Sequence, residues 1–376
     1  MAGPSEHRTD VVIVGGGVAG LWILHRLLGR GVDALLIDRH GGRDPRAQTR
    51  SSQGILHRGT KYLLRGDSNS SMLDDGFPDL LERWRVCLEA AEVGRRRPGD
   101  PDLTSVRPLA DGVDLVQVSS GDPSLRSRLR DAAARGLVHE TSAGSFRLLE
   151  PVLDPASLLD ALWRQVEARC LVGTPRIGIQ ASSVRVRVGR HRVAARRLVL
   201  AAGAGNAPLL SGLGRRQPTM VRRLVHLVWV DDPPGRHVLP PVQAHVLDDA
   251  AAPGSRGAHW TVTSTGSDAR GWRWTVGGDP SERGVGRSDR RQHAEIRRLI
   301  ARAFPALDVA SLRLTSHRVD KAEPVLPGGG RRLEPFVHDD GTVLTAWPLK
   351  LVLAPLLADR VVERLTTSSS RPWRSS

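Results

Sequence analysis

The sequence predicts an α/β fold, α+β overall, in which a parallel-sheet domain is interleaved with an antiparallel-sheet domain. Three observations predict it. A strand–helix–strand pattern begins at residue 10, and apolar strands that lead into helices recur near residues 198 and 343. Between them, residues 221–280 alternate strand-like segments with Pro, Gly and Asp turns. Because parallel-type pieces flank antiparallel ones, we expect each domain to be built from separated pieces of the chain.

The individual elements follow from periodicity, caps and turn residues. Residues 10–14 and 33–38 are predicted as parallel strands around a helix over 21–28. Further helices are predicted at 77–92, 122–137, 150–170, 287–305 and 349–365, the last of them interrupted or restarted at Pro355. Further strands are predicted at 113–118, 175–179, 184–188, 196–202, 222–230, 258–264, 272–278 and 341–347.

Length and composition fit a globular protein. The chain has 376 residues, 40% of them hydrophobic, which is enough for a substantial core. No apolar run approaches the roughly 20 residues that a membrane-spanning helix needs, and the polar N-terminus does not resemble a signal peptide. Two distant cysteines, Cys87 and Cys170, exclude a disulfide framework and a cysteine metal cluster. A cytoplasmic protein is expected.

The formal charge of +15 comes from arginines that are spread along the chain with acidic residues between them. There is no sustained basic arm and no basic stripe with interleaved aromatic residues. We interpret the charge as a compositional bias that favours anionic ligands, and nucleic acid is not expected as a partner.

The stretch "GGGVAG" carries the first functional signal. Gly15 permits a tight turn, Gly17 allows a pyrophosphate to approach the backbone, and Gly20 allows close packing of helix and strand. The helix N-terminus then faces the phosphates. Asp38 ends the second strand, where it can accept hydrogen bonds from a ribose. The motif predicts a dinucleotide site but does not distinguish FAD from NAD.

Several ordered segments together resemble the D-amino-acid-oxidase-like flavoproteins, which include glycine oxidase, sarcosine oxidase, 2-hydroxyglutarate oxidase and glycerol-3-phosphate dehydrogenase. The resemblance covers nearly all of residues 10–365. The segments that carry it are "VVIVGGGVAGLWILHRLLGRGVDALLIDR", "SSQGILHRGTKYL", "FRLLEPVLDP", "WRWTVGGDPSERGV" and "TAWPLKLVLAPLLAD".

The resemblance implies a Rossmann-like FAD-binding domain interleaved with an antiparallel-sheet substrate domain. The FAD-binding domain is expected at 8–75, 145–212 and 316–365, and the substrate domain at 76–144 and 213–315. The tail, residues 366–376, is expected to be disordered.

By position, the resemblance implies the following FAD contacts: Gly15, Gly17, Gly20, Asp38, Arg39, Ser51, Ser52, Gln53, Gly54, Ile177, Ala202, Gly203, Trp347, Leu349 and Lys350. A related group attaches its flavin covalently through a Trp-His pair. Here Leu56 precedes His57, so non-covalent FAD is predicted.

The chain has only three lysines, and all of them fall in segments that the family uses near its flavin or substrate. The resemblance implies catalytic or site roles for Lys61 and Lys350, and it makes Lys321 a candidate substrate contact. An ammonium group at these positions suits the carboxylate of a small substrate.

His57 matches a flavin-proximal position and could accept a proton from an amine or alcohol. Tyr62, the only tyrosine, is either a substrate contact or a packing residue. Arg318 occupies a position where relatives bind a carboxylate, although the usual Arg-Pro pair is missing. The histidines show no metal-binding spacing, so no metal is predicted.

The resulting hypothesis is an FAD-dependent oxidase or dehydrogenase that oxidises a C–N or C–OH bond of a small anionic amino acid or hydroxy acid. Hydride would pass to flavin N5, and oxygen or another acceptor would reoxidise the flavin. One alternative is a glycerol-3-phosphate-type dehydrogenase that delivers electrons to a quinone. The alternative from another class is a flavoprotein that binds or modifies RNA.

Overall fold

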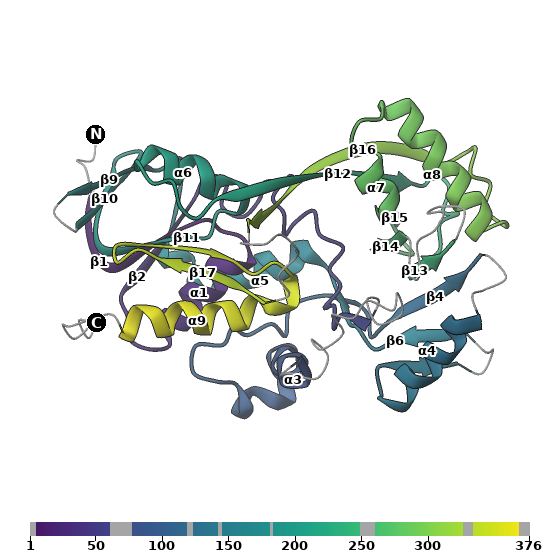
Figure 1. Cartoon of the computed structure of the whole chain (residues 1–376), viewed down its shortest axis with the longest axis horizontal. Coiled ribbons are helices and arrows are strands. Elements are labelled where there is room, and N and C mark those ends of the chain that lie inside the picture. Colours follow the sequence, from purple (N-terminus) through teal and green to yellow (C-terminus); the bar gives the residue numbers. More distant parts are fainter. Residues whose placement is uncertain are drawn as a thin grey trace.

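The computed structural model describes residues 5–60, 77–118, 123–141, 145–180, 183–248, 260–325 and 334–367. Lys61, Tyr62 and residues 368–376 of the expected tail therefore lie outside the described residues. Figure 1 shows two lobes, one built on a mostly parallel sheet and the other on a largely antiparallel sheet.

The first lobe contains the expected nucleotide-binding sheet. Its six-strand path runs β17-β18-β11-β1-β2-β8, and β9 and β10 extend it as an antiparallel hairpin on β11. The pairs β11–β1, β1–β2, β2–β8 and β11–β18 are parallel. The strands are β1 (Ser5–Val14), β2 (Ala34–Asp38), β8 (Cys170–Val172), β9 (Arg176–Gln180), β10 (Ser183–Val188), β11 (His191–Leu200), β17 (Phe336–Asp339) and β18 (Val343–Trp347).

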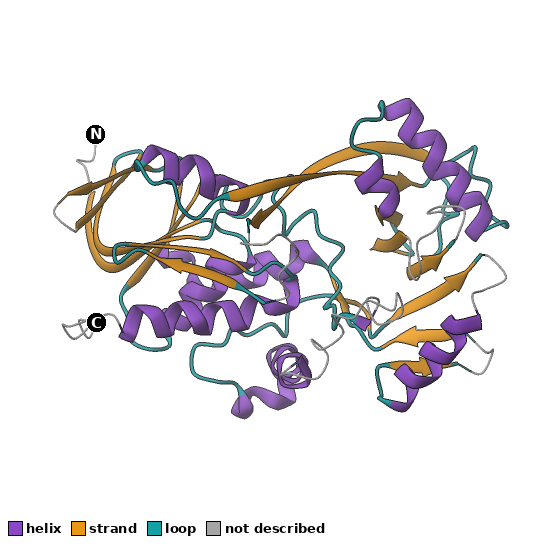
Figure 2. Cartoon of the chain, viewed as in Figure 1, coloured by secondary structure: helices purple, strands orange, loops and turns teal. Residues whose placement is uncertain are grey.

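Helices cover one face of this sheet, as Figure 2 shows. They are α1 (Val18–Leu28), α5 (Pro155–Val166) and α9 (Ala354–Thr367), with α3 (Phe77–Leu88) packed beside them. Their buried side chains include Trp22, Trp84 and Leu357, which join Val11 and Ile13 of β1 in one cluster. The opposite face packs against β10 and the short helix α6 (Asn206–Gly212).

The second lobe is an eight-stranded sheet in the order β16-β12-β15-β14-β13-β4-β6-β5. Its strands are β4 (Val113–Gln117), β5 (Val138–Glu140), β6 (Phe146–Leu148), β12 (Met220–Asp231), β13 (Gln243–Leu247), β14 (Trp260–Ser267), β15 (Gly271–Gly278) and β16 (Arg313–Pro324). Its helices are α4 (Pro123–Ala134), α7 (Asp279–Arg283) and α8 (Asp289–Ala303). All pairs but β13–β4 are antiparallel, as expected.

Short elements complete the chain. A two-stranded sheet pairs β3 (Pro108–Ala110) with β7 (Val152–Leu153). The 3₁₀ turns are η2 (Ala90–Arg95), η3 (Glu167–Arg169), η4 (Gly203–Gly205) and η5 (Leu351–Leu353). η5 leads directly into α9, whose Pro355 lies in the first helical turn, where its missing N–H costs nothing.

The sheets correct the expected domain boundaries. β16 pairs with β12 along its whole length, so the second lobe extends to Pro324 instead of ending at residue 315. β6 pairs with β4 and β5, although residues 145–212 were expected in the FAD-binding domain. Conversely, α3 belongs to the first lobe, because Leu80, Trp84 and Cys87 pack in its core.

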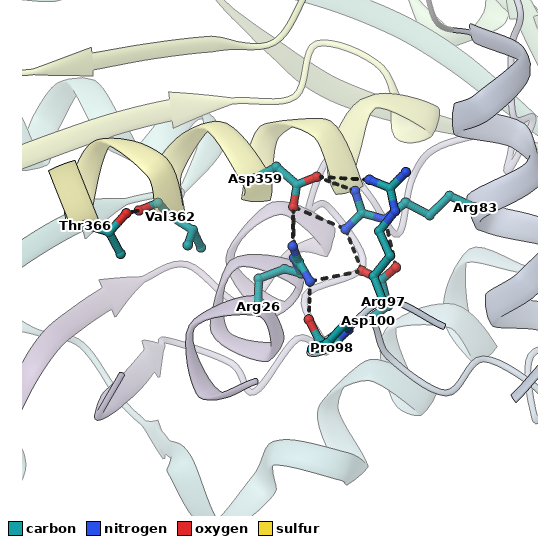
Figure 3. A network of polar contacts seen from close by, with 8 residues as sticks. All are labelled: Arg26, Arg83, Arg97, Pro98, Asp100, Asp359, Val362 and Thr366. Atoms are coloured by element: carbon teal, nitrogen blue, oxygen red, sulfur yellow. Dashed lines mark hydrogen bonds and ion pairs between the residues drawn. The ribbon is translucent and has the colours of Figure 1, made fainter. Parts of the chain in front are cut away.

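A buried ion-pair network docks α3 and α9 onto α1 (Figure 3). Arg83 of α3 contacts Asp100 at 2.5 Å and 2.8 Å and Asp359 of α9 at 2.5 Å. Arg26 of α1 donates to the same Asp359 at 2.8 Å and to the carbonyl of Pro98. The Arg26, Arg83 and Asp100 side chains are each at most 5% exposed, whereas that of Asp359 is 28% exposed, so three buried charges each have a close partner of opposite charge.

The structure also bears on the cysteines and on membrane-spanning helices. Both cysteines are free, and burial raises the pKa of each thiol to about 12, which keeps them protonated and poor nucleophiles. Within the described residues, no helix is long and apolar enough to cross a membrane.

Candidate active site between the two sheets

The turn after β1 is shaped for a closely approaching ligand. Gly15 has a φ of +117°, and a Cβ there would lie 2.5 Å from the carbonyl oxygen of Ala201. A Cβ on Gly20 would lie 1.9 Å from the Gly15 carbonyl oxygen. Gly17 is the N-cap of α1 and has no side chain to cover the first N–H groups. The turn therefore brings backbone without side-chain cover from Gly17 to a helix N-terminus, which suits a pyrophosphate.

Asp38 organises the neighbouring loop. Its Oδ2 accepts from the Gly16 N–H at 2.7 Å, and its Oδ1 accepts from the N–H groups of His40 and Gly42, each at 2.9 Å. The carboxylate is partly exposed at the end of β2. Arg39 beside it is largely exposed and lies 3.8 Å from Asp44. The predicted ribose-side residues thus stand together at the carboxyl end of the parallel strands.

Residues Gln48–Arg58, which we call the crossing segment, run from the glycine turn across the second sheet. The hydroxyl of Thr49 accepts from the Val18 N–H of α1 at 3.3 Å. Gln48 Oε1 accepts from the Ala322 N–H of β16 at 3.3 Å. Ser51 Oγ lies 2.9 Å from His317 Nε2, also on β16. The start of the segment is therefore tied to both lobes.

The middle of the crossing segment continues over the sheet. Gln53 Nε2 donates to the carbonyl of Thr261 on β14 at 3.2 Å and to that of Thr275 on β15 at 3.1 Å. Gly54 has a φ of +72°, and a Cβ there would lie 1.9 Å from the Leu153 carbonyl oxygen. The side chain of Gln53 thus anchors the segment to the second sheet. Ser52 Oγ is buried and has no hydrogen-bond partner among the described residues.

The end of the segment carries His57 into a cluster with Glu150 and His245. His57 Nδ1 lies 2.8 Å from Oε2 of Glu150, whose side chain is fully buried. The other oxygen, Oε1, accepts from the N–H groups of Arg58 at 2.9 Å and Thr60 at 3.3 Å. The ring of His245, on β13, stacks on that of His57 with centroids 5.6 Å apart and an interplanar angle of 13°.

The three groups of this cluster offer metal-ligand atoms within 4.8 Å of one another. A hydrogen-bonded imidazole and carboxylate at 2.8 Å, however, already form a complete pair that shares one proton. We therefore interpret the cluster as proton-handling, although two histidines and a carboxylate are also a familiar zinc ligand set. Burial lowers the pKa of the adjacent Arg58 guanidinium, while the charge of Glu150 opposes that shift.

The loop after β11 brings its predicted residues beside the glycine turn. Ala202 donates its N–H to Asn206 Oδ1 at 2.7 Å, and Asn206 is fully buried. Trp347 Nε1 donates to the Gly203 carbonyl at 3.2 Å. Gly203 has a φ of +56°, and a Cβ there would lie 3.8 Å from Gln48 Oε1. Ala202, Gly203 and Trp347 thus form one packed group next to the crossing segment.

Leu349 and Lys350 lie where a helix begins. Leu349 has a φ of +64°, the only positive φ of a non-glycine residue among the described ranges. Lys350 is the N-cap of η5 and is partly buried. Because η5 continues into α9, the backbone after Lys350 presents helix N–H groups and positive potential, as the sequence predicted.

Two other predicted substrate residues, Arg318 and Lys321, lie on β16, where successive side chains point to opposite faces of the sheet. His317 faces the crossing segment, so Arg318 points to the opposite face, where it lies 2.7 Å from Asp289 of α8. This position argues against Arg318 as a carboxylate ligand. Lys321 lies four residues after His317 on β16, so its side chain is on the same face of the strand, and it is partly buried. Ile177 lies on β9 and packs with the second hydrophobic face of the first sheet.

Sequence reasoning missed several residues of the site. Glu150, Asn206, His245 and His317 contact predicted residues, and Thr49 accepts from the N–H of Val18, next to the predicted Gly17. Glu150 had a signal, since it stands in the quoted "FRLLEPVLDP" segment, and Asn206 and His317 stand in the segments "AAGAGN" and "HRVDKAEP". The others sit in ordinary strands, turns and loops, and their roles depend on which face of a distant strand meets the crossing segment.

The described residues fit FAD: a glycine turn that a Cβ would fill, a bare helix N-terminus and the orphaned hydroxyl of Ser52. Comparisons with known proteins agree. A probable FAD-dependent oxidoreductase of Pseudomonas aeruginosa, PA4991, is 34% identical over 98% of this chain and 94% of its own length. The crystal structure of PA4991 superposes with a TM-score of 0.77, at 31% identity over 99% of this chain and 94% of that one.

Two more distant proteins are similar, the first in structure and the second in sequence. Glycine oxidase from Geobacillus kaustophilus has a TM-score of 0.64 at 14% identity, covering 98% of this chain and 99% of that one. The tRNA 5-methylaminomethyl-2-thiouridine biosynthesis bifunctional protein MnmC of Paraburkholderia phytofirmans is 25% identical over 64% of this chain but only 37% of its own length. The family model described as FAD dependent oxidoreductase (DAO) matches residues 10–364. The chain belongs to this family of FAD-dependent oxidoreductases.

Proposed function

We propose that this FAD-dependent oxidoreductase oxidises the carbon–hydrogen bond beside the amine or hydroxyl of a small anionic amino acid or hydroxy acid. The observation that carries the proposal is the crossing segment. It joins the N-terminus of α1, through Thr49, to a carboxylate-paired histidine, His57, against the second sheet. One short stretch of chain, anchored to both lobes, thus carries the proposed proton acceptor and contacts the start of α1 beside the glycine turn.

Oxidation of such a substrate removes a proton and a hydride. When bound, FAD supplies the two-electron acceptor at N5. In the proposed step, His57 takes the proton from the substrate N–H or O–H, and the hydride leaves the neighbouring carbon for the flavin. The product is an imine or a carbonyl compound. The residues of the chain hold the substrate, exclude water and receive the proton.

Lys350 is the proposed partner of the substrate carboxylate, since an ammonium group at a helix start adds its charge to that of the helix N-terminus. Lys61 follows His57 in the sequence and is proposed as a second cation, and Tyr62 as a substrate contact. Lys321 shares the strand face of His317 and remains a candidate. Arg318 is left out, because its guanidinium pairs with Asp289 on the other face.

A small anion is favoured over RNA because many arginines are already neutralised by the chain itself. Arg83, Arg147 and Arg273, for example, contact carboxylates at 2.5–2.6 Å. Arginines that are tied in this way offer little to a phosphate backbone. A gel shift that weakens steeply with salt would restore the RNA-modifying alternative.

The primary test is anaerobic reduction of the purified yellow protein by a panel of amino acids and hydroxy acids. A substrate is expected to bleach the flavin absorbance. Admission of air then distinguishes an oxidase, which reoxidises rapidly, from a dehydrogenase, which needs a quinone. Acid precipitation should leave the flavin in the supernatant, as non-covalent binding requires. Failure of every member of the panel to bleach a fully loaded protein would overturn the proposal.

Variants then test the substrate contacts. Lys350→Met is expected to raise KM for the anionic substrate roughly 10-fold to 100-fold, with partial recovery in Lys350→Arg. Lys61→Met should act similarly if its ammonium binds substrate, while Tyr62→Phe separates a hydroxyl contact from simple packing. Arg318→Met serves as the matched control, and an unchanged KM is expected for it.

A further inference from the structure

Glu150 is held as a charged carboxylate by the backbone around His57. Its side chain is fully buried, in a loop that precedes β7. Two backbone N–H groups, from Arg58 and Thr60, point at Oε1 at 2.9 Å and 3.3 Å. Donors of this kind stabilise the ionised form of a carboxyl group and cannot accept a proton from it. Oε2 is left facing His57 Nδ1 at 2.8 Å.

This arrangement fixes the chemistry of the His57 ring. An ionised carboxylate can only accept hydrogen bonds, so the proton between the two groups belongs to Nδ1. In a neutral imidazole with Nδ1–H, the lone pair lies on Nε2. We propose that Glu150 is a positioning residue that selects the Nδ1–H tautomer of His57, so that Nε2 is the atom that accepts the substrate proton.

His245 restricts the ring from one side. Its own ring is fully buried and lies nearly parallel to that of His57, and its Nδ1 is 2.8 Å from the hydroxyl of Thr261. Glu150 is therefore hydrogen-bonded to one edge of the His57 ring, and His245 stacks on one of its faces. The His57 side chain keeps 22% of its surface exposed, so a small molecule can still reach the ring.

The catalytic consequence rests on the proposed function, whereas the tautomer rests on the hydrogen bonds alone. When Nε2 of His57 takes the proton from a substrate N–H or O–H, the ring becomes an imidazolium. The carboxylate of Glu150 stabilises this new positive charge, and the substrate loses its hydride to the cofactor. Among the described residues, the titratable or charged groups that face or adjoin His57 include Glu150, His245 and Arg58.

The tautomer can be read directly by ¹⁵N NMR of histidine-labelled protein with FAD bound. The His57 signals are assigned by their loss in His57→Gln. The wild type is expected to show a protonated Nδ1 and an unprotonated Nε2. A wild-type ring that carries its proton on Nε2 overturns the inference, whatever the enzyme oxidises. Because this measurement needs no substrate, it stays decisive if the proposed function fails.

A second measurement tests the positioning role during the reaction. Glu150→Gln keeps the shape of the side chain but removes its charge and offers an N–H to Nδ1. The limiting rate of anaerobic flavin reduction is expected to fall about 100-fold or more. Its rise with pH should move to lower pH, because the charge that favours the protonated ring has been removed. Glu150→Asp should recover part of the rate.

Glu140→Gln, at an exposed position of β5, is the matched control and should leave both the rate and its pH profile unchanged. FAD content and thermal midpoint are measured for each variant, so that loss of folding is separated from loss of positioning. If Glu150→Gln folds, binds FAD and keeps both the rate and the pH profile of the wild type, then Glu150 does not position the base. If Glu150→Gln does not fold, the tautomer of His57 measured in the wild type by itself tests the inference.

Discussion

Ser51 and His317 stand 266 residues apart in the chain, yet Ser51 Oγ lies 2.9 Å from His317 Nε2. The contact joins the crossing segment to β16 and so ties the nucleotide-binding lobe to the second sheet. His317 also stacks on Trp229 of β12, with ring centroids 4.0 Å apart. Its imidazole is thereby held neutral in a buried position, where burial lowers its pKa and the charge of Arg273 lowers it further.

This contact predicts a pH dependence of stability. The pKa of His317 in the folded protein lies below its usual value of 6.5, so the unfolded state binds more protons as the pH falls. The stabilisation from the neutral His317 is complete above pH 6.5, and it is lost as the pH falls from 6.5 toward the lower pKa of the folded state. Urea unfolding from about pH 7.5 down to about pH 5.5 should show a smaller loss of unfolding free energy in His317→Gln than in the wild type. The exposed His139→Gln is the control, and equal losses in all three proteins would contradict the prediction.

Gly15→Ala should impair FAD binding. The φ of +117° is strained for alanine, and the added Cβ would meet the Ala201 carbonyl oxygen at 2.5 Å. We expect a cost of at least ~2 kcal/mol, which corresponds to a more than tenfold fall in FAD affinity if the strain falls on the bound state. The ratio of flavin to protein absorbance after dialysis measures this. Gly178→Ala on β9, where a Cβ meets nothing within 4 Å, is the control and should retain its FAD.

Arg83→Met should destabilise the first lobe. It would leave Asp100, whose side chain is 1% exposed, with only the more distant Arg26 at 3.9 Å. Removing one partner of a buried ion pair costs roughly 3–5 kcal/mol, because the remaining charge stays desolvated. Chemical denaturation measures the loss. Arg85→Met on the same helix removes pairs with Glu82, Glu89 and Glu92 in which the Arg85 side chain is 39% exposed, and a comparable loss there would count against the network.

Leu349 offers a test of backbone conformation just before η5. At a φ of +64°, the left-handed backbone is strained for leucine but not for glycine, and it is more strained for a β-branched residue. Leu349→Gly should therefore keep the fold and its FAD, while Leu349→Val should be less stable by about 1–2 kcal/mol. Parallel measurements of unfolding free energy and flavin content compare the two. If valine matches glycine, the turn adopts another conformation in solution.

The sequence by itself determined the parts that depend on near neighbours. Gly15, Gly17, Gly20 and Asp38 lie within one strand–helix–strand unit, so their spacing alone predicted the turn that the structure contains. The start of α9 after Lys350 was predicted for the same reason. Family membership also followed from sequence, because several short segments in a fixed order are each close to a known pattern.

Local signals failed where strand pairing decided the outcome. Helical spacing ran on to residue 170, but Cys170–Val172 form β8, because pairing beside β2 extends the parallel sheet. β13 and β16 were not predicted, and β16 moved the domain boundary to Pro324. On β16, His317 points toward the crossing segment and Arg318 points to the other face. The alternation within a strand separates the two residues but does not say which of its faces meets the crossing segment.

Only the tertiary structure decided how the proton-handling cluster is assembled. His57, Glu150 and His245 come from the crossing segment, from the loop before β7 and from β13, elements that no local pattern connects. They meet because the crossing segment runs across the second sheet and is anchored there by Ser51 and Gln53. The sequence determined which residues form the glycine turn, and the packing of the two sheets decided which groups surround His57.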